Sequence, residues 1–341
     1  MEENEHRSAY ERFVRPFLFT LDPETAHHLA LGYLKFASDF PALLSPLRTF
    51  QPPPKPTHAF GLNFPNPIGL AAGFDKNGVA LPAWEALGFG FIEIGTVTVK
   101  AQPGNPKPRI FRYPAQEALI NRLGFNNDGA DVVAERLRRL RASGRWPGIP
   151  VGVNLGKSKA TELEHAAEDY LYSFRRLREF ADYIALNVSS PNTPGLRALQ
   201  GVEPLTELLQ IIQTENQRPA KPVLLKIAPD LSLAELEQLI GTCEQHGIAG
   251  LIATNTTLDH SGIPPADDQT GGLSGRPLRE KSIALIREIR QRTSLPIIAV
   301  GGICDPASAR EKFEAGAALA QVYTGYIYRG PGLLRAVLGS A

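Results

Sequence analysis

The segment from Tyr183 to Gly195 holds the residues of this chain that are best placed to do chemistry. Its first half is a short apolar run of the kind that is buried on both faces in a parallel sheet. Pro191 and Pro194 end that strand, because proline lacks a backbone donor and has a fixed φ. A strand end and a rigid turn therefore present four polar side chains, Asn187, Ser189, Ser190 and Asn192. A plain surface loop of Asn, Ser and Pro is the alternative interpretation.

Residues that a buried strand avoids also end most other short apolar runs: Lys76, Thr96, Asn154, Lys226, Thr254, Asn255, Gly302, Tyr323 and Thr324. A satisfied polar group or a helix cap explains any one of them, but not a set at equivalent positions. Asparagine side chains both donate and accept, so they suit a planar ligand edged with carbonyl and N–H groups. Lys76 suits a carboxylate, whereas Lys226 suits either an electron-rich ring or a Schiff base.

Two glycine-containing segments indicate a phosphate. Gly301-Gly302 follows the seventh apolar run and Tyr323-Thr324-Gly325 follows the eighth, which is where α/β barrels commonly bind phosphate. Glycine lets backbone N–H groups approach an anion closely. The chain contains neither a G-x-G-x-x-G fingerprint nor a P-loop. We therefore expect a phosphate-bearing ligand without a Rossmann dinucleotide site.

These residues need elements that bring them together, and the chain provides a regular alternation from Phe60 onward. Eight short β-rich runs alternate with helix-length segments; the runs are 67–73, 91–96, 150–154, 183–187, 223–227, 250–255, 296–302 and 320–325. Eight β-α units predict a TIM (β/α)8 barrel, an α/β fold whose strand ends converge on one face where active sites are built. We expect the insertion 100–127 to form part of that face.

Residues 1–50 are predicted to form a small helical hairpin before a barrel domain of residues 51–341. Asp22 is placed as an N-cap, and Pro16 is expected to kink the first helix or cost it a hydrogen bond. The proline-rich stretch 51–56 follows as a stiff spacer. The apolar face of the hairpin either packs on the barrel or lies in a membrane interface, where it forms the mouth of a tunnel for a lipid-soluble molecule.

Composition excludes several classes of protein. With 36 Lys and Arg against 35 Asp and Glu, the chain has no field to attract a nucleic acid. The two cysteines, Cys243 and Cys304, are far apart, which argues against a disulfide framework, a zinc site and an iron–sulfur cluster. No apolar run approaches the length of a membrane span, and the acidic start, residues 1–6, lacks the features of a signal peptide.

Several long motifs, in the same order, resemble the membrane-associated, quinone-linked class of dihydroorotate dehydrogenases. They are Gly69-Leu-Ala-Ala-Gly-Phe-Asp-Lys76, Asn121-Arg-Leu-Gly-Phe-Asn-Asn, Asn187-Val-Ser-Ser-Pro-Asn-Thr-Pro-Gly and Gly272-Leu-Ser-Gly-Arg-Pro. The resemblance covers essentially the whole chain. It implies a TIM barrel that binds FMN, oxidises dihydroorotate to orotate in pyrimidine biosynthesis and passes electrons to a quinone. It also implies a monomer, bound peripherally to the cytoplasmic face of a bacterial cell membrane.

The resemblance also implies residue roles. Ser190 is the expected catalytic base, at a position where the soluble class has a cysteine. The expected FMN contacts are Ala72, Gly73, Phe74, Asp75, Lys76, Thr96, Asn154, Asn187, Lys226, Thr254, Gly275, Gly302, Tyr323 and Thr324. The expected orotate contacts are Lys76, Asn121, Arg122, Leu123, Gly124, Phe125, Asn187, Asn192, Asn255 and Thr256. His27 and Arg112 resemble residues near the quinone tunnel of the family.

Two other classes of function stay open at this point. An aldolase-like lyase would use Lys226 as a Schiff-base nucleophile and the glycine-rich corner for a substrate phosphate. A membrane-docked binding protein would keep the barrel without its chemistry, although Ser190, Lys226 and Lys76 are all present. A flavin barrel that acts on RNA bases would need a basic surface, which the charge balance does not supply.

Overall fold

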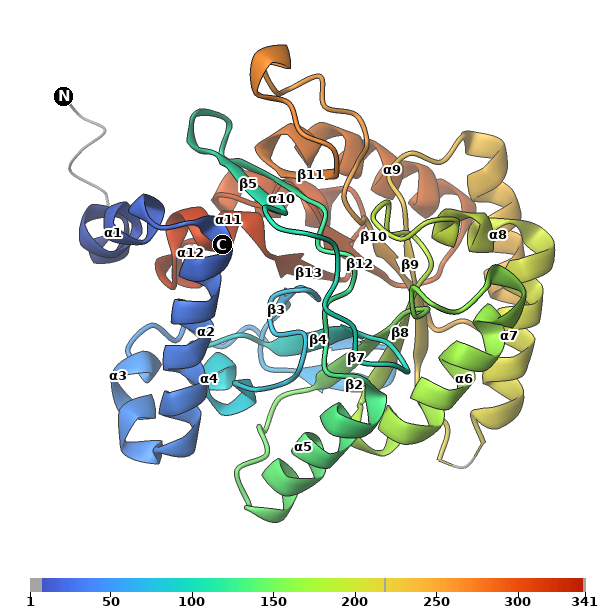
Figure 1. The fold of residues 1–341 in the computed structure, drawn as a ribbon, viewed down its shortest axis with the longest axis horizontal. Helices are drawn as coiled ribbons and strands as arrows, with labels where there is room; N and C mark the ends of the chain where they lie inside the picture. Colours follow the sequence, from blue (N-terminus) through green and yellow to red (C-terminus); the bar gives the residue numbers. More distant parts are fainter. Residues whose placement is uncertain (1–7, 218, 340–341) are drawn as a thin grey trace.

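The barrel that the sequence predicts is confirmed in the computed structural model, which describes residues 8–217 and 219–339 (Figure 1). Its strands are parallel and close in the order β10-β12-β13-β3-β4-β7-β8-β9. Their bounds are β3 (Ile68–Leu70), β4 (Phe91–Val97), β7 (Val151–Leu155), β8 (Tyr183–Asn187), β9 (Val223–Ile227), β10 (Gly250–Ala253), β12 (Ile297–Val300) and β13 (Leu319–Val322). Because both faces of each strand are covered, most of their residues are fully buried.

Helices surround the barrel: α4 (Leu81–Ala86), α5 (Ala130–Ala142), α6 (Ala166–Leu177), α7 (Val202–Glu215), α8 (Leu233–Gln245), α9 (Arg279–Arg292), α10 (Pro306–Glu314), α11 (Thr324–Arg329) and α12 (Gly332–Gly339). Each amphipathic helix turns its apolar stripe to the sheet. In α7, for example, Leu205, Leu208, Leu209 and Ile212 are all buried.

A hairpin closes the barrel at the end where the strands begin. It consists of β1 (Thr57–Ala59) and β2 (Leu62–Phe64). The Phe64 ring packs edge-on against Phe91 inside the barrel, with the ring centroids 5.3 Å apart. The interior at this end is therefore lined by apolar side chains, and the polar side chains of the cavity lie at the opposite end.

The insertion 100–127 lies over the carboxyl ends of the strands, as predicted. It forms β5 (Ile110–Tyr113) and β6 (Ala118–Asn121), and β11 (Gly272–Gly275) completes an antiparallel sheet in the order β11-β6-β5. Two loops that are 150 residues apart in the sequence are thus joined by backbone hydrogen bonds above the barrel.

The N-terminal residues form several short helical segments beside the barrel. A π-helical turn, Tyr10–Val14, leads into α1 (Arg15–Thr20), and α2 (Pro23–Asp39) and α3 (Leu44–Arg48) follow. Pro16 lies at the second position of α1, directly after the π-helical turn, so the regular α-helical hydrogen-bond pattern is interrupted next to the proline. Asp22 caps α2 as predicted, since its carboxylate accepts hydrogen bonds from the backbone N–H groups of Glu24 and Thr25. The acidic start, residues 1–6, lies outside the described residues.

These helices share a core with the barrel and also present an exposed apolar face. Leu34, Ala37, Leu44 and Leu47 belong to the same buried cluster as the barrel helices. The exposed large apolar residues of this part are Phe13, Val14, Phe17, Leu29, Tyr33, Phe36 and Phe40. Both interpretations of the segment therefore have support, and its division from residues 51–341 stays a prediction.

Two arginines of the insertion attach these helices to it. The Arg109 guanidinium donates to both carboxylate oxygens of Glu24, at 2.6 Å from Nη2 and 3.1 Å from Nε. Arg112 donates to the backbone carbonyl oxygens of Leu18, Phe19 and Leu21. Helix α2 is thus connected to the insertion that covers the carboxyl ends of the strands.

Candidate active site

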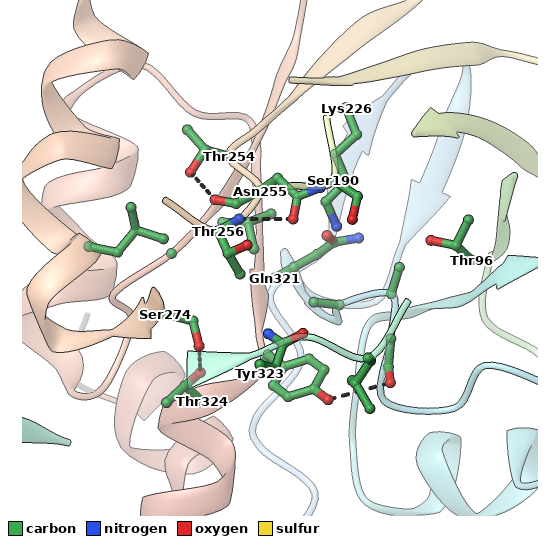
Figure 2. Close-up of a pocket in the computed structure, with 18 of the residues that line it drawn as sticks. Thr96, Ser190, Lys226, Thr254, Asn255, Thr256, Ser274, Gln321, Tyr323 and Thr324 are labelled. Atoms are coloured by element: carbon green, nitrogen blue, oxygen red, sulfur yellow. Dashed lines mark hydrogen bonds between the residues drawn. The ribbon is translucent and has the colours of Figure 1, made fainter. Parts of the chain in front are cut away.

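A cavity opens at the carboxyl ends of the strands, with about 970 Å³ of empty space when the part open to solvent is included (Figure 2). Ser190 lines it together with most of the predicted FMN contacts, namely Ala72, Gly73, Lys76, Thr96, Asn187, Lys226, Thr254, Gly275, Gly302, Tyr323 and Thr324. Most of the predicted orotate contacts line it as well, namely Lys76, Asn121, Leu123, Gly124, Phe125, Asn187, Asn192, Asn255 and Thr256. Residues from the ends of β3, β4, β8, β9, β10, β12 and β13 and from the insertion therefore converge on one space.

Four of the predicted contacts lie outside the lining of this cavity. The Phe74 ring faces His27 and Trp84, away from the polar residues. The Asp75 carboxylate is fully buried and accepts from the N–H groups of Val79, Ala80 and the Trp84 indole. Asn154 lies behind Thr96, and the Arg122 guanidinium donates to Thr270 and Pro108. Their roles as ligand contacts stay predictions.

Asn187 connects the polar residues of neighbouring strand ends. Its Nδ2 donates to the Thr96 hydroxyl at 2.9 Å, and that hydroxyl donates to Asn154 Oδ1 at 2.6 Å. Its Oδ1 accepts from Asn255 Nδ2 at 3.1 Å. The amide orientations of these side chains are therefore set before any ligand arrives, which is the preorganisation that a specific site needs.

Ser190 is buried, with 6% of its surface exposed, on the loop that follows β8. Its Oγ accepts from the backbone N–H of Asn192 at 3.2 Å. Asn192 in turn donates through Nδ2 to the carbonyl oxygen of Asn121 at 3.0 Å, which ties this loop to the insertion. The hydroxyl is thus held at the boundary between the barrel and the insertion, and its own proton is free to move to a ligand or a base.

Of the two lysines of the cavity, Lys226 is buried and Lys76 is half-buried, and removal from water disfavours their charged forms. Desolvation and the charge of Arg109 together lower the pKa of Lys76 to about 8, although Glu24 and Asp75 act in the opposite direction. Burial also lowers the pKa of Lys226, against the opposing effect of Glu93, whose carboxylate Oε1 lies 4.0 Å from Nζ. An anionic ligand would favour the charged form of either side chain.

Glycines shape the phosphate end of the cavity. Gly302 has φ +75°, and a Cβ there would lie 2.4 Å from the Cα of Arg279. A Cβ on Gly325 would lie 1.9 Å from the carbonyl oxygen of Ile303. No other residue fits at either place, so the backbone N–H groups of this corner stay accessible to an anion.

Sequence reasoning missed two polar residues of the lining, Gln321 and Ser274. Gln321 lies within β13 and not at its end, so a search of strand ends passed over it. A polar residue in the otherwise apolar run Leu319–Val322 was the available signal. Ser274 lies on β11, and its hydroxyl oxygen is 2.9 Å from that of Thr324. The pairing of β11 with β6 brings Ser274 to the cavity.

A second cavity, with an open space of about 1,380 Å³, lies between the N-terminal helices and the barrel. It contains both residues predicted near a tunnel, His27 and Arg112, and its other lining residues are mostly aromatic or aliphatic. Tyr323 lines both this cavity and the first one, so one ring forms part of the wall between them. Within residues 8–217 and 219–339, no helix has the length and apolar character to cross a bilayer.

Comparison with known proteins identifies close relatives. Residues 56–339 match the family model described as dihydroorotate dehydrogenase. The chain is 54% identical to dihydroorotate dehydrogenase (quinone) of Gloeobacter violaceus, over 96% of this chain and 93% of the relative. It is 51% identical to the protein of the same name from Salinispora arenicola, over 97% and 98% of the two chains. A crystal structure of DHODH from Eimeria tenella in complex with ferulenol superposes with a TM-score of 0.83 at 37% identity, over 93% of this chain and 90% of that one.

Proposed function

The chain belongs to the dihydroorotate dehydrogenase family, and we propose that its first cavity oxidises dihydroorotate to orotate in pyrimidine biosynthesis, with FMN as cofactor and a quinone as electron acceptor. The observation that carries the proposal is the convergence of Ser190, two lysines, a set of asparagines and a glycine-lined corner on one cavity.

The residues present fit FMN. The corner at Gly302, Thr324 and Gly325 offers backbone N–H groups and a hydroxyl to the phosphate, as an anion requires. Lys226, Asn187 and Thr96 would meet the polar edge of the isoalloxazine ring, and Tyr323 would lie against it. When bound, FMN supplies the hydride acceptor that no side chain can provide.

The asparagines fit dihydroorotate. Asn121, Asn192 and Asn255 surround the part of the cavity between the barrel and the insertion, and each offers both a donor and an acceptor to the ring amides of the substrate. Lys76 would hold the substrate carboxylate. An anion there favours the charged form of Lys76, whose pKa of about 8 in the free protein would rise on binding.

Ser190 would then remove the proton from C5 of dihydroorotate as hydride leaves C6. A serine hydroxyl is a weak base, so its proton must pass to water or to a neighbouring hydroxyl, and the rate should rise with pH until that relay is deprotonated. Lys226 would stabilise the negative charge that develops on the flavin ring when the ring is reduced.

The second cavity would receive the quinone. Its apolar lining suits a lipid-soluble ring and tail. The exposed apolar residues of α1 and α2 would rest in the headgroup region of a membrane, which makes the protein peripheral on the cytoplasmic face of a bacterial cell membrane. We also propose that it works as a monomer, which size-exclusion chromatography of detergent-free protein would check.

The visible spectrum tests the function. Purified protein should be yellow, and anaerobic addition of dihydroorotate should bleach the flavin absorbance, which a quinone should then restore. Colourless protein in which borohydride traps a substrate on Lys226 would instead establish the aldolase-like alternative.

A further inference from the structure

Beneath the floor of the first cavity lies a carboxylate that the mechanism above does not use. Glu93, on β4, has no exposed surface. Its Oε2 accepts from the Gln321 amide at 2.7 Å and from the Tyr183 hydroxyl at 3.0 Å, and its Oε1 accepts from Asn154 Nδ2 at 2.8 Å. The Lys226 ammonium lies 4.0 Å from Oε1. Side chains from four strands, β7, β8, β9 and β13, thus point at one buried group.

A carboxylate without exposure is costly unless donors and a cation compensate it. The three donors and the Lys226 cation offset the cost of burying the charge of Glu93. Within the described residues it is the one charge that acts on Lys226. Tyr183, the other titratable member, stays neutral because burial, together with the charge and hydrogen bond of Glu93, raises its pKa far above the ordinary value.

The ionised carboxylate also sets the orientation of Gln321. An ionised carboxylate only accepts hydrogen bonds, so the side of the amide that faces Glu93 must be the NH2 group. The amide oxygen must then face away. Among the described residues Gln321 Oε1 has no hydrogen-bond partner, although the side chain is 1% exposed and lines the cavity (Figure 2). A buried acceptor that lacks a partner in the protein indicates a ligand donor.

We propose that Glu93 is a positioning residue for the cofactor: it keeps Lys226 protonated at the cavity floor and turns the amide oxygen of Gln321 toward an N–H group of the bound ring. The inference rests on the proposed binding of FMN. The polar side chains beneath the cavity would thus hold a cation, Lys226, beside an acceptor, the amide oxygen of Gln321. This pair favours an electron-rich ring that carries N–H groups over a ring that lacks them.

The variant Glu93→Gln tests the proposal because it removes the charge and keeps the shape. Without the carboxylate, Lys226 should lose its proton at lower pH, and the new amide can donate to Gln321 and reverse it. Wild type should bind reduced FMN with little change between pH 6 and pH 9. The variant should bind it about tenfold more weakly at the upper end of that range than at the lower end, the size expected for one added ionisation.

Two further variants keep the test decisive. Tyr183→Phe removes one donor but no charge, so it should shift the affinity in the same direction by less, and it serves if Glu93→Gln does not fold. Ser173→Ala removes a buried, unpartnered hydroxyl outside this layer and should leave FMN affinity unchanged at every pH. Equal weakening of oxidised and reduced FMN at all pH values, or an affinity profile like that of wild type, would overturn the role of Glu93. Wild type that binds no FMN would overturn the proposed function itself.

Discussion

The polar cavity at the strand ends and the apolar cavity beside the N-terminal helices differ in what their walls offer. The first is built from strand ends, and its side chains form hydrogen bonds to one another before any ligand binds, as in the Thr96–Asn187–Asn255 chain. The second is built from short N-terminal helices and is lined mainly by carbon. Tyr323 contributes to both. A rigid polar site suits a small charged substrate, whereas an apolar site between the N-terminal helices and the barrel suits a lipid-soluble one.

The contrast indicates a division of labour. In the proposed reaction, the substrate is oxidised in the polar cavity and the acceptor is reduced from the apolar one, with the aromatic residues Phe74 and Tyr323 between them, 5.2 Å apart. Changes in one cavity should therefore affect one half-reaction. The following variants are ordered from the largest expected effect to the smallest.

The substitution Ser190→Ala should have the largest effect. Loss of a general base typically slows the step by about 10²- to 10⁴-fold. Flavin reduction by dihydroorotate, followed in a stopped-flow instrument, should fall by that factor, while reoxidation of chemically reduced enzyme by quinone should keep its rate. A Ser190→Ala enzyme that is reduced at the wild-type rate would remove serine from the mechanism.

The substitution Arg109→Ala should loosen the connection between α2 and the insertion. Glu24 is buried, and although burial opposes its ionisation, the hydrogen bonds and charge of Arg109 lower its pKa to about 2. Without Arg109 this carboxylate loses its main partner, which costs about 3 kcal/mol of unfolding free energy for a buried pair. Chemical denaturation measures the loss. As a control, Arg138→Ala breaks an exposed pair with Glu135 and should change nothing measurable.

Acid should release the N-terminal helices before it unfolds the barrel. Burial and the nearby Lys76 lower the pKa of His27 to about 3, so the folded state binds the proton less well than the released segment does. Neutral His27 therefore contributes to the stability of the packed N-terminal helices above about pH 6.5. This contribution is lost as the pH falls toward 3, and the loss of free energy is about 2 kcal/mol at pH 5. The hydrogen-exchange protection factors of α2, which are corrected for the intrinsic pH dependence of amide exchange, should fall between pH 7 and pH 5. His27→Leu should abolish that fall; if it persists, another group is responsible.

The substitution Asp22→Ala should have the smallest effect. Its carboxylate caps α2 through the N–H groups of Glu24 and Thr25, at 3.1 Å and 3.0 Å, and losing such a cap costs about 1 kcal/mol. The thermal stability of the N-terminal helices should fall slightly while flavin reduction stays unchanged. Asp39→Ala, at the other end of α2, is the matched control and should not destabilise the helix.

Much of the barrel could be predicted from the sequence because each strand is a short apolar run that ends in a residue unsuited to burial. The same rule located Thr96, Asn187 and Lys226 on the cavity, since parallel strands place their carboxyl ends together. It failed for polar residues within strands. Glu93 and Gln321 face the inside of the barrel, and nothing in the local pattern shows that they meet across it at 2.7 Å.

Pairing between strands that are distant in the sequence limited the prediction of the other cavity residues. Ser274 reaches the cavity only because β11 pairs with β6, and the sequence does not show that pairing. The motif around Asp75 predicted a ligand contact, yet the structure directs this carboxylate into three N–H groups behind the cavity. A motif predicts that a residue lies near a site, whereas the direction of its side chain depends on the groups that surround it in the fold.

The separation of the two half-reactions tests the account most directly. Ala30, on α2, lines only the apolar cavity of the two, and Ala30→Phe places a ring in that space. Measured side by side, flavin reduction by dihydroorotate should match wild type, and reoxidation by quinone should slow by about tenfold, because a bulky side chain excludes the acceptor. A variant in which both rates fall by the same factor would contradict the assignment of one half-reaction to each cavity.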